Sequence, residues 1–218
     1  LNFSGNGLAF MSGKLDASAT TLTNAGVFRL ASTDSPRSWS GAIVNTGTLR
    51  HEGGGLGWEG ASLQNSGTLE LLTGDWGYRS GTNSVQNLGA GSVVKTGTGT
   101  FTLGISLENR NLVSVQQGVL VVAPSFENRA TVSVQQGALT VLGAITGGGV
   151  WNVAAGTTLH WGGTGELSGS HNGTVAGSAT LSGTHTVPAS GTALNFSGNG
   201  LAFMSGKLDA SATTLTNA

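Results

Sequence analysis

Hydrophobic and polar residues alternate along this chain in short runs of about four positions, and glycine, serine or asparagine separates the runs. Clear examples are residues 27–30 (VFRL), 68–71 (TLEL) and 119–122 (VLVV). A period of two is typical of a β-strand that buries one of its two faces. No stretch of a dozen residues keeps apolar positions at helical spacing without a glycine in it. The pattern therefore predicts an all-β protein.

Asparagines mark a register in which these strands recur. Six stretches place an apolar residue two positions before an asparagine and begin a strand soon after it. The six asparagines are Asn24, Asn45, Asn65, Asn87, Asn109 and Asn128, with spacings of 21, 20, 22, 22 and 19. A recurring unit of 19–22 residues that holds two or three short strands is typical of one coil of a right-handed parallel β-helix, or β-solenoid. Stacked side-chain amides can hydrogen-bond along the axis, so we expect the six asparagines to form a structural ladder.

The last quarter of the chain has a different rhythm. Residues 167–171 (LSGSH) and 181–185 (LSGTH) are alike and lie 14 positions apart. If this spacing is one coil, the coils near the end are shorter and narrower, at about 14 residues each. It also predicts that His171 and His185 are exposed turn residues in successive coils.

Residues 1–25 are repeated letter for letter as residues 194–218, which gives a period of 193. Such a long exact match indicates duplication of a whole block. We expect residues 1–193 to be one tandem solenoid unit and residues 194–218 to be the start of the next identical unit. No proline-rich linker separates them, so the solenoid is expected to continue without a joint. The two copies are expected to superpose by a shift along the axis with a modest twist.

Composition excludes several classes of protein. Charged residues make up only 9% of the chain and the formal net charge is −1, which favours neither nucleic acid nor membrane insertion of this fragment. Glycine is abundant, at 38 of 218 residues, but 38% of the residues are hydrophobic, so a core is expected rather than disorder. The chain has no cysteine, hence neither a disulfide framework nor a thiolate metal site.

Residues 92–103 (SVVKTGTGTFTL), followed by residues 117–121 (QGVLV), resemble the autotransporter-associated β-strand repeat. The Asn-x-Gly-Thr-Leu segments at 45–49 and 65–69 are similar to coils of filamentous-haemagglutinin-like surface proteins. The resemblance implies a right-handed parallel β-helix that is secreted or exposed on a bacterial surface.

Tryptophans supply the candidate binding residues. Trp39, Trp58 and Trp76 follow one another at spacings of 19 and 18, close to the coil period, and Tyr78 follows the last of them. At this spacing the rings should stack as a column on one edge. Such a column either fills a wide coil corner or caps a sheet, contacts a protein partner, or binds a glycan.

Catalytic and metal sites have less support. The chain has ten Asp and Glu residues, and Glu108 and Glu127 each precede an arginine by two positions in matched turns. These carboxylates are more simply explained as solvated turn charges than as an acid/base pair. The glycine runs at 53–55 and 147–149 lack the Asp of a calcium-binding β-roll. We therefore expect no catalytic residues, no cofactor and no metal ion.

These observations predict an extracellular structural protein that forms a fibre, sheath or stalk by stacking on copies of itself. The alternative is a surface adhesin that binds a glycan or a host protein through its aromatic edge. A polysaccharide-active enzyme on the same fold is a third reading.

Overall fold

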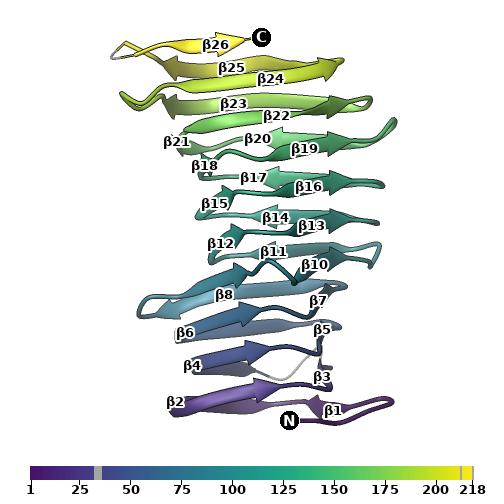
Figure 1. The fold of residues 1–218 in the computed structure, drawn as a ribbon. Helices are drawn as coiled ribbons and strands as arrows, with labels where there is room; N and C mark the ends of the chain where they lie inside the picture. Colours follow the sequence, from purple (N-terminus) through teal and green to yellow (C-terminus); the bar gives the residue numbers. More distant parts are fainter. Residues whose placement is uncertain (32–35, 212, 218) are drawn as a thin grey trace.

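The computed structural model describes residues 1–31, 36–211 and 213–217, and every regular element in these ranges is a β-strand. The chain winds upwards from the N-terminus in stacked coils, so that the two ends of the chain lie at opposite ends of an elongated molecule (Figure 1). It is a parallel β-solenoid of about 10 turns, which confirms the predicted fold class.

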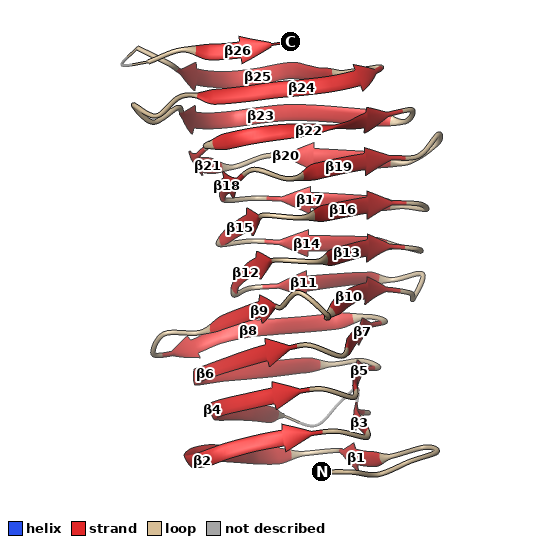
Figure 2. Ribbon diagram, viewed as in Figure 1, coloured by secondary structure: helices blue, strands red, loops and turns tan. Residues whose placement is uncertain are grey.

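One sheet of 11 strands forms the first face of the solenoid. In order, its strands are β1 (Leu8–Phe10), β3 (Val27–Leu30), β5 (Thr48–His51), β7 (Thr68–Leu71), β10 (Ser92–Lys95), β13 (Leu112–Val115), β16 (Thr131–Val134), β19 (Val150–Val153), β22 (Gly169–Val175), β24 (Thr192–Gly198) and β26 (Leu215–Asn217). All of these pairs are parallel. The arrows of β13, β16, β19, β22, β24 and β26 point the same way in Figure 2.

A second sheet of 15 strands bends around a corner and supplies two further faces. The second face holds β8 (Gly74–Ser80), β11 (Thr100–Leu103), β14 (Val119–Val122), β17 (Ala138–Val141) and β20 (Thr158–Trp161). The third face holds β9 (Ser84–Asn87), β12 (Ser106–Asn109), β15 (Ser125–Asn128), β18 (Ala144–Gly147) and β21 (Thr164–Glu166). Long strands run around the corner and belong to both faces: β2 (Gly13–Asn24), β4 (Arg37–Asn45), β6 (Gly55–Asn65), β23 (Ser178–Thr186) and β25 (Leu201–Asp209). Each turn thus visits face 1, face 2 and face 3 in that order.

Alternating side chains of every face point inward and form one continuous core. In the middle coils, β10, β13 and β16 align Val93, Val113 and Val132, all fully buried. In each of these strands, the outward position between the two inward residues is Ser or Val. Because identical apolar residues stack in successive coils, the core is filled while the backbone hydrogen bonds between coils are formed. This explains why the alternating pattern predicted the fold.

Glycine is required at the turn between face 1 and face 2 of the middle coils. Gly118 and Gly137 have φ values of 72° and 86°, a region that glycine enters without strain. A Cβ on Gly137 would lie 1.9 Å from the carbonyl oxygen of Gly118. The repeated Gln-Gln-Gly sequence therefore marks a corner where the backbones of successive coils are in close contact.

The predicted narrow coils near the C-terminus are absent from the described residues. Partner residues there are 20 to 23 positions apart, as in Thr158 with Ser178 and Asn172 with Asn195. The two LSG(S/T)H motifs are two faces apart rather than one coil apart: His171 lies in β22 on face 1, and His185 lies in the face-3 part of β23. The interval between the two motifs is therefore about two thirds of an ordinary coil of this solenoid.

Candidate functional site: the asparagine ladder and the aromatic column

The structure contains the predicted asparagine ladder at the corner between face 3 and face 1. Each Nδ2 donates to the Oδ1 of the next asparagine, at 2.7 to 2.9 Å, in the unbroken order Asn24, Asn45, Asn65, Asn87, Asn109, Asn128. Each of the first five also donates to a backbone carbonyl at the start of the next-coil strand on face 1, at 3.0 to 3.1 Å. All six side chains are buried. The ladder satisfies polar groups that the sharp corner would otherwise leave unpaired.

The ladder ends where the sequence changes. In the next coil the position paired with Asn128 is Gly147, which has no side-chain acceptor. Among the described residues, the Nδ2 of Asn128 and the Oδ1 of Asn24 have no hydrogen-bond partner. The ladder is thus a bounded element of six coils, and every amide within it points in the same direction.

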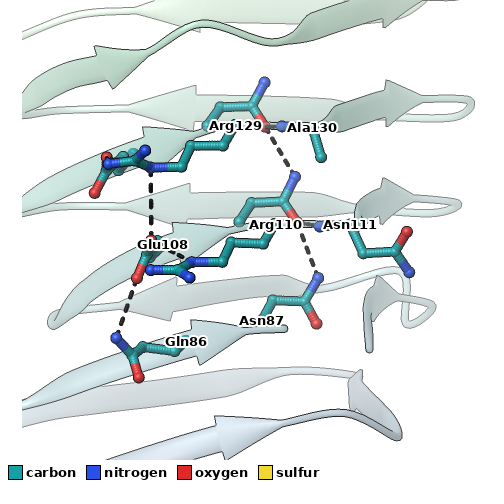
Figure 3. A network of polar contacts seen from close by, with 10 residues as sticks. Gln86, Asn87, Glu108, Arg110, Asn111, Arg129 and Ala130 are labelled. Carbon is teal, nitrogen blue, oxygen red and sulfur yellow. Dashed lines mark hydrogen bonds and ion pairs between the residues drawn. The ribbon is translucent and has the colours of Figure 1, made fainter. Parts of the chain in front are cut away.

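A second ladder, of charges, runs along the outside of face 3 beside the asparagines (Figure 3). Glu108 accepts from Gln86 of the coil before it at 3.1 Å and from Arg110 at 2.6 Å. Arg129 of the following coil lies 3.6 Å from Glu108 and 2.5 Å from Glu127. Both carboxylates are held by arginines on an exposed face, as expected for solvated turn charges.

Trp39, Trp58 and Trp76 do stack as a column, but the column is inside the solenoid. Their ring centroids are 5.4 Å apart for Trp39 and Trp58, and 5.0 Å apart for Trp58 and Trp76. All three side chains are 0% exposed. Of the alternatives that the spacing left open, these rings therefore fill wide coils. Strand parity turns them toward the core, so they do not present a contact edge for a glycan or a partner.

Tyr78 is the member of the predicted edge that is exposed, at 64%. It pairs in register with Trp58 near the end of β8, but β11 of the next coil stops at Leu103, opposite Trp76. Strand β11 therefore does not extend over Tyr78. Close to it, Glu59 is paired with Lys14 at 3.2 Å and with Arg79 at 3.6 Å.

A buried histidine completes the aromatic column, and the sequence analysis did not single it out. Trp76 donates its indole N–H to Nδ1 of His51 at 2.8 Å, and Nε2 of His51 lies 2.9 Å from the carbonyl oxygen of Gly54. This arrangement fixes a neutral ring that donates from Nε2. Burial lowers the pKa of His51 from 6.5 to about 4. Its inward parity two positions after Leu49 was the signal that would have located it.

His171 and His185 are both 0% exposed, so their expected placement in exposed turns is wrong. The ring of His171 packs against Trp161, with centroids 5.1 Å apart, and Trp161 packs against Trp151 at 4.9 Å. Burial lowers the pKa of His171 to about 4 and lowers the pKa of His185. The C-terminal coils therefore hold a second aromatic cluster with a histidine in it.

Lys95 is another inward-facing polar residue that the sequence analysis missed. It occupies the core position of Leu71 and Val115 in the neighbouring coils and is fully buried. Its Nζ donates to the backbone carbonyls of Gly97 and Gln117, the second at 3.2 Å. Burial lowers the pKa of Lys95, and its ammonium group holds together the turns of two coils.

The described residues contain no cluster of three His, Asp or Glu side chains with the geometry of a metal site. Within those same ranges, no helix is long and apolar enough to cross a membrane. Comparison of the chain with models of known protein families gives no match, and no curated protein or solved structure matches it significantly.

Proposed function

We propose that this chain is a section of a tandem-repeat fibre or stalk on a bacterial surface, with a mechanical rather than a catalytic role. Its partners are copies of the same unit, which stack end to end so that both sheets continue from one unit into the next. The extracellular location follows from the resemblance to autotransporter-associated repeats and is consistent with the absence of cysteine.

The observation that carries this proposal lies in the last coils, where the repeated segment continues the solenoid without a break: β24 pairs in parallel with β22, and β25 pairs in parallel with β23. A cavity of about 350 Å³ opens there and is lined by apolar side chains of the second copy: Leu194, Phe196, Leu201, Phe203, Leu208 and Leu215. Phe203 is 50% exposed. In the first copy the equivalent residue, Phe10, packs against Phe28 of the following coil, with ring centroids 6.4 Å apart. A following unit would cover Phe203 in the same way.

The backbone supports a load-bearing role. Successive coils are joined by parallel ladders on their faces, except between β18 and β21 on face 3, where a single bridge joins Ile145 and Leu167. The asparagine ladder adds side-chain bonds at one corner. Because each coil contacts only its neighbours, adding coils lengthens such a structure without changing its interior. Low charge on the outward positions would also allow neighbouring solenoids to pack side by side.

A two-unit chain tests the proposal. The 193-residue unit is placed ahead of the present chain, and particle length is measured by small-angle scattering and electron microscopy. We expect one straight rod that is longer by about 45 Å, at about 4.8 Å per coil. Two rods joined at variable angles would overturn the proposal.

Core and surface variants at the junction sharpen this test. Phe203→Ser should lower the stability of the two-unit chain far more than that of the present chain. In the two-unit chain the second unit covers the ring, whereas in the present chain the ring is half exposed. Met204→Ser is the matched control, because Met204 is 66% exposed and its equivalent Met11, which already lies below another coil, is 53% exposed. Equal effects of Phe203→Ser in both chains would count against end-to-end stacking.

Adhesion is the second candidate, and it now depends on Tyr78. This ring is exposed, as are Asp75 and Arg79 of the same strand, and an exposed aromatic ring with polar groups on its strand is a candidate sugar-binding surface. Binding of the chain and of its Tyr78→Ala variant to a panel of glycans tests this. Equal binding by both proteins would remove Tyr78 as a contact residue.

A further inference from the structure

One column of inward side chains on face 3 crosses two kinds of boundary between coils. The column consists of Val85, Leu107, Phe126, Ile145 and Leu167. As far as Ile145, the strands that carry it are paired over three or four residues at each step. Between Ile145 and Leu167 there is only an isolated bridge. We call this boundary between β18 and β21 the seam; the two strands lie one above the other in Figure 1.

The seam is confined to face 3. At the same level of the solenoid, β16 pairs with β19 on face 1 and β17 pairs with β20 on face 2, each over four residues. At the seam the N–H of Ser168, just after β21, donates to the carbonyl oxygen of Ile145 at 3.0 Å. A Cβ on Gly165 would lie 2.5 Å from the backbone nitrogen of Ala144. The two strands are therefore in close contact without forming a ladder.

Side chains strengthen face 3 below the seam. The amide of Asn109 donates to Asn128 at 2.8 Å, and the hydroxyl of Ser125 donates to that of Ser106 at 2.8 Å. Both bonds join successive coils. Strand β18 carries Gly147 at the ladder position, so it has no amide with which to bond to the coil above it. The asparagine ladder thus ends on the N-terminal side of the seam, and the backbone bridge is left to join face 3 there.

Glycine at the adjoining corner also favours opening. Gly147 and Gly169 have φ values of 87° and 102°, and a Cβ on Gly169 would lie 1.3 Å from the carbonyl oxygen of Gly147. A residue with a side chain does not fit where the two backbones approach so closely. Because glycine loses more conformational entropy on ordering than any other residue, this corner regains more entropy when it opens than a corner built from other residues.

We propose that the seam is the place where the solenoid opens first under axial load, with face 3 separating between β18 and β21 while faces 1 and 2 stay paired. The inference rests on the proposed mechanical role and gives each 193-residue unit of the array one such seam. A load that exceeds the strength of the seam would be relieved by this local opening, and the coils joined by the asparagine ladder would remain folded.

Pulling on internal handles tests the response to load. Because the chain has no cysteine, Glu127→Cys with Thr186→Cys attaches handles to β15 and β23, on either side of the seam. The matched control is Gln64→Cys with Glu127→Cys, which spans the same number of strand steps, from β6 to β15, within the ladder. In an optical trap we expect the seam pair to open at least about tenfold faster at a given force, because fewer hydrogen bonds join its coils. Equal opening rates would overturn the proposal.

Thiol labelling measures opening without load. Leu167→Cys and its control Leu107→Cys each place a thiol at an inward position of face 3 where the leucine is at most 1% exposed. A buried thiol reacts only when its strand opens, so we expect Leu167→Cys to react at least about tenfold faster. Hydrogen exchange of the unmodified chain checks that the substitutions have not loosened the core, and it should rank the two positions in the same order. Slower exchange at Leu167 than at Leu107 would overturn the proposal.

These measurements separate the seam from the proposed function. Both are made on single chains, so a two-unit chain that fails to form a continuous rod would overturn the fibre while leaving the seam intact. Conversely, uniform opening along face 3 would overturn the seam and leave the continuous array standing. Faster labelling at the seam with equal opening rates under force would also overturn the proposal, because load would then not select this boundary.

Discussion

The middle coils and the tryptophan-bearing coils of this solenoid solve the same packing problem with different side chains. The middle coils repeat at a spacing of 19 between Leu112 and Gly147 and fill their interior with Val, Leu, Ile and Phe. The coils around Trp39, Trp58 and Trp76 have partners at separations of up to 27, as between Trp76 and Leu103, and enclose three indoles and His51. Longer coils leave more room inside, and large rings fill that room.

The two kinds of coil differ in the polar side-chain atoms that they bury. Aliphatic coils bury few polar side-chain atoms apart from the ladder, so near-identical coils can be stacked many times over. Each indole has an N–H group: that of Trp76 donates a hydrogen bond to His51, whereas in the described part of the chain those of Trp39 and Trp58 have no acceptor. An unpaired buried donor lowers stability. The wide coils therefore gain stability from the apolar contacts of the rings and lose part of that stability because two indole N–H groups are unpaired.

The largest expected effect is the loss of the central ring of the column. Trp58 lies between two other indoles and is fully buried, so Trp58→Ala should lower the free energy of unfolding by about 3–5 kcal/mol. Urea unfolding followed by tryptophan fluorescence measures it. Leu139→Ala in the middle coils is the matched variant and should cost less, about 2–3 kcal/mol. A larger loss for Leu139→Ala would mean that the wide coils are loosely packed.

The next effect separates the middle of the ladder from its end. Asn87→Ala removes bonds to Asn65, Asn109 and the carbonyl of Leu112, and leaves buried groups unpaired, so it should cost about 2–3 kcal/mol. Asn128→Ala should cost about 1 kcal/mol, because Asn128 accepts from Asn109 and from the N–H of Ala130 but, among the described residues, makes no bond through its Nδ2. Hydrogen exchange of the flanking strands reports both. Equal effects would show that the two bonds donated by the Nδ2 of Asn87 add nothing to the stability of this corner.

Acid should weaken the aromatic coils before the aliphatic ones. Burial lowers the pKa of His51 and of His171 to about 4, so each ring binds a proton more readily in the unfolded chain. Their contribution is complete above about pH 6.5 and decreases as the pH falls toward 4, by about 2 kcal/mol per histidine at pH 5. Hydrogen exchange at pH 7 and pH 5 locates the loss, and His171→Phe should abolish it near Trp161. An unchanged profile in that variant would assign the acid sensitivity elsewhere.

The smallest effect is expected on the outside of the middle coils. Arg129 is exposed and pairs with Glu108 and Glu127, so Arg129→Ala should change stability by less than about 0.5 kcal/mol. The measurement is the midpoint of urea unfolding at low and high salt. A loss above about 1 kcal/mol that disappears in high salt would show that the charge ladder acts as a network.

The sequence predicted those parts of the fold that obey a period. Val113 and Val132, or Asn109 and Asn128, take equivalent places because each coil repeats the environment of the last. The prediction was wrong where similar sequence segments lie on different faces of the solenoid. The two LSG(S/T)H motifs, for example, lie on different faces: His171 is in β22 on face 1, and His185 is in the face-3 part of β23. The spacing between two motifs gives a number of residues, but the face of the solenoid on which each motif lies depends on the fraction of a coil that this number spans.

Burial was the other weakness of the sequence analysis. The spacing of Trp39, Trp58 and Trp76 left a buried column and an exposed contact edge both open, and His171 and His185 were expected in exposed turns, but all five side chains are buried. Their positions within each strand decided otherwise, since alternate residues of a strand point to opposite faces. Counting parity from the neighbouring apolar residue, such as Leu49 for His51, would have placed that ring in the core.

The asparagine ladder also gives the molecule a head and a tail. Five amides donate in one sense, toward the C-terminal coils, so their dipoles add along the axis instead of cancelling. Within the part of the chain that the structure describes, the unpaired acceptor of the ladder is at Asn24 and the unpaired donor is at Asn128. A filament assembled from such units is polar: its two ends are chemically different, and a parallel bundle of such filaments differs from an antiparallel one.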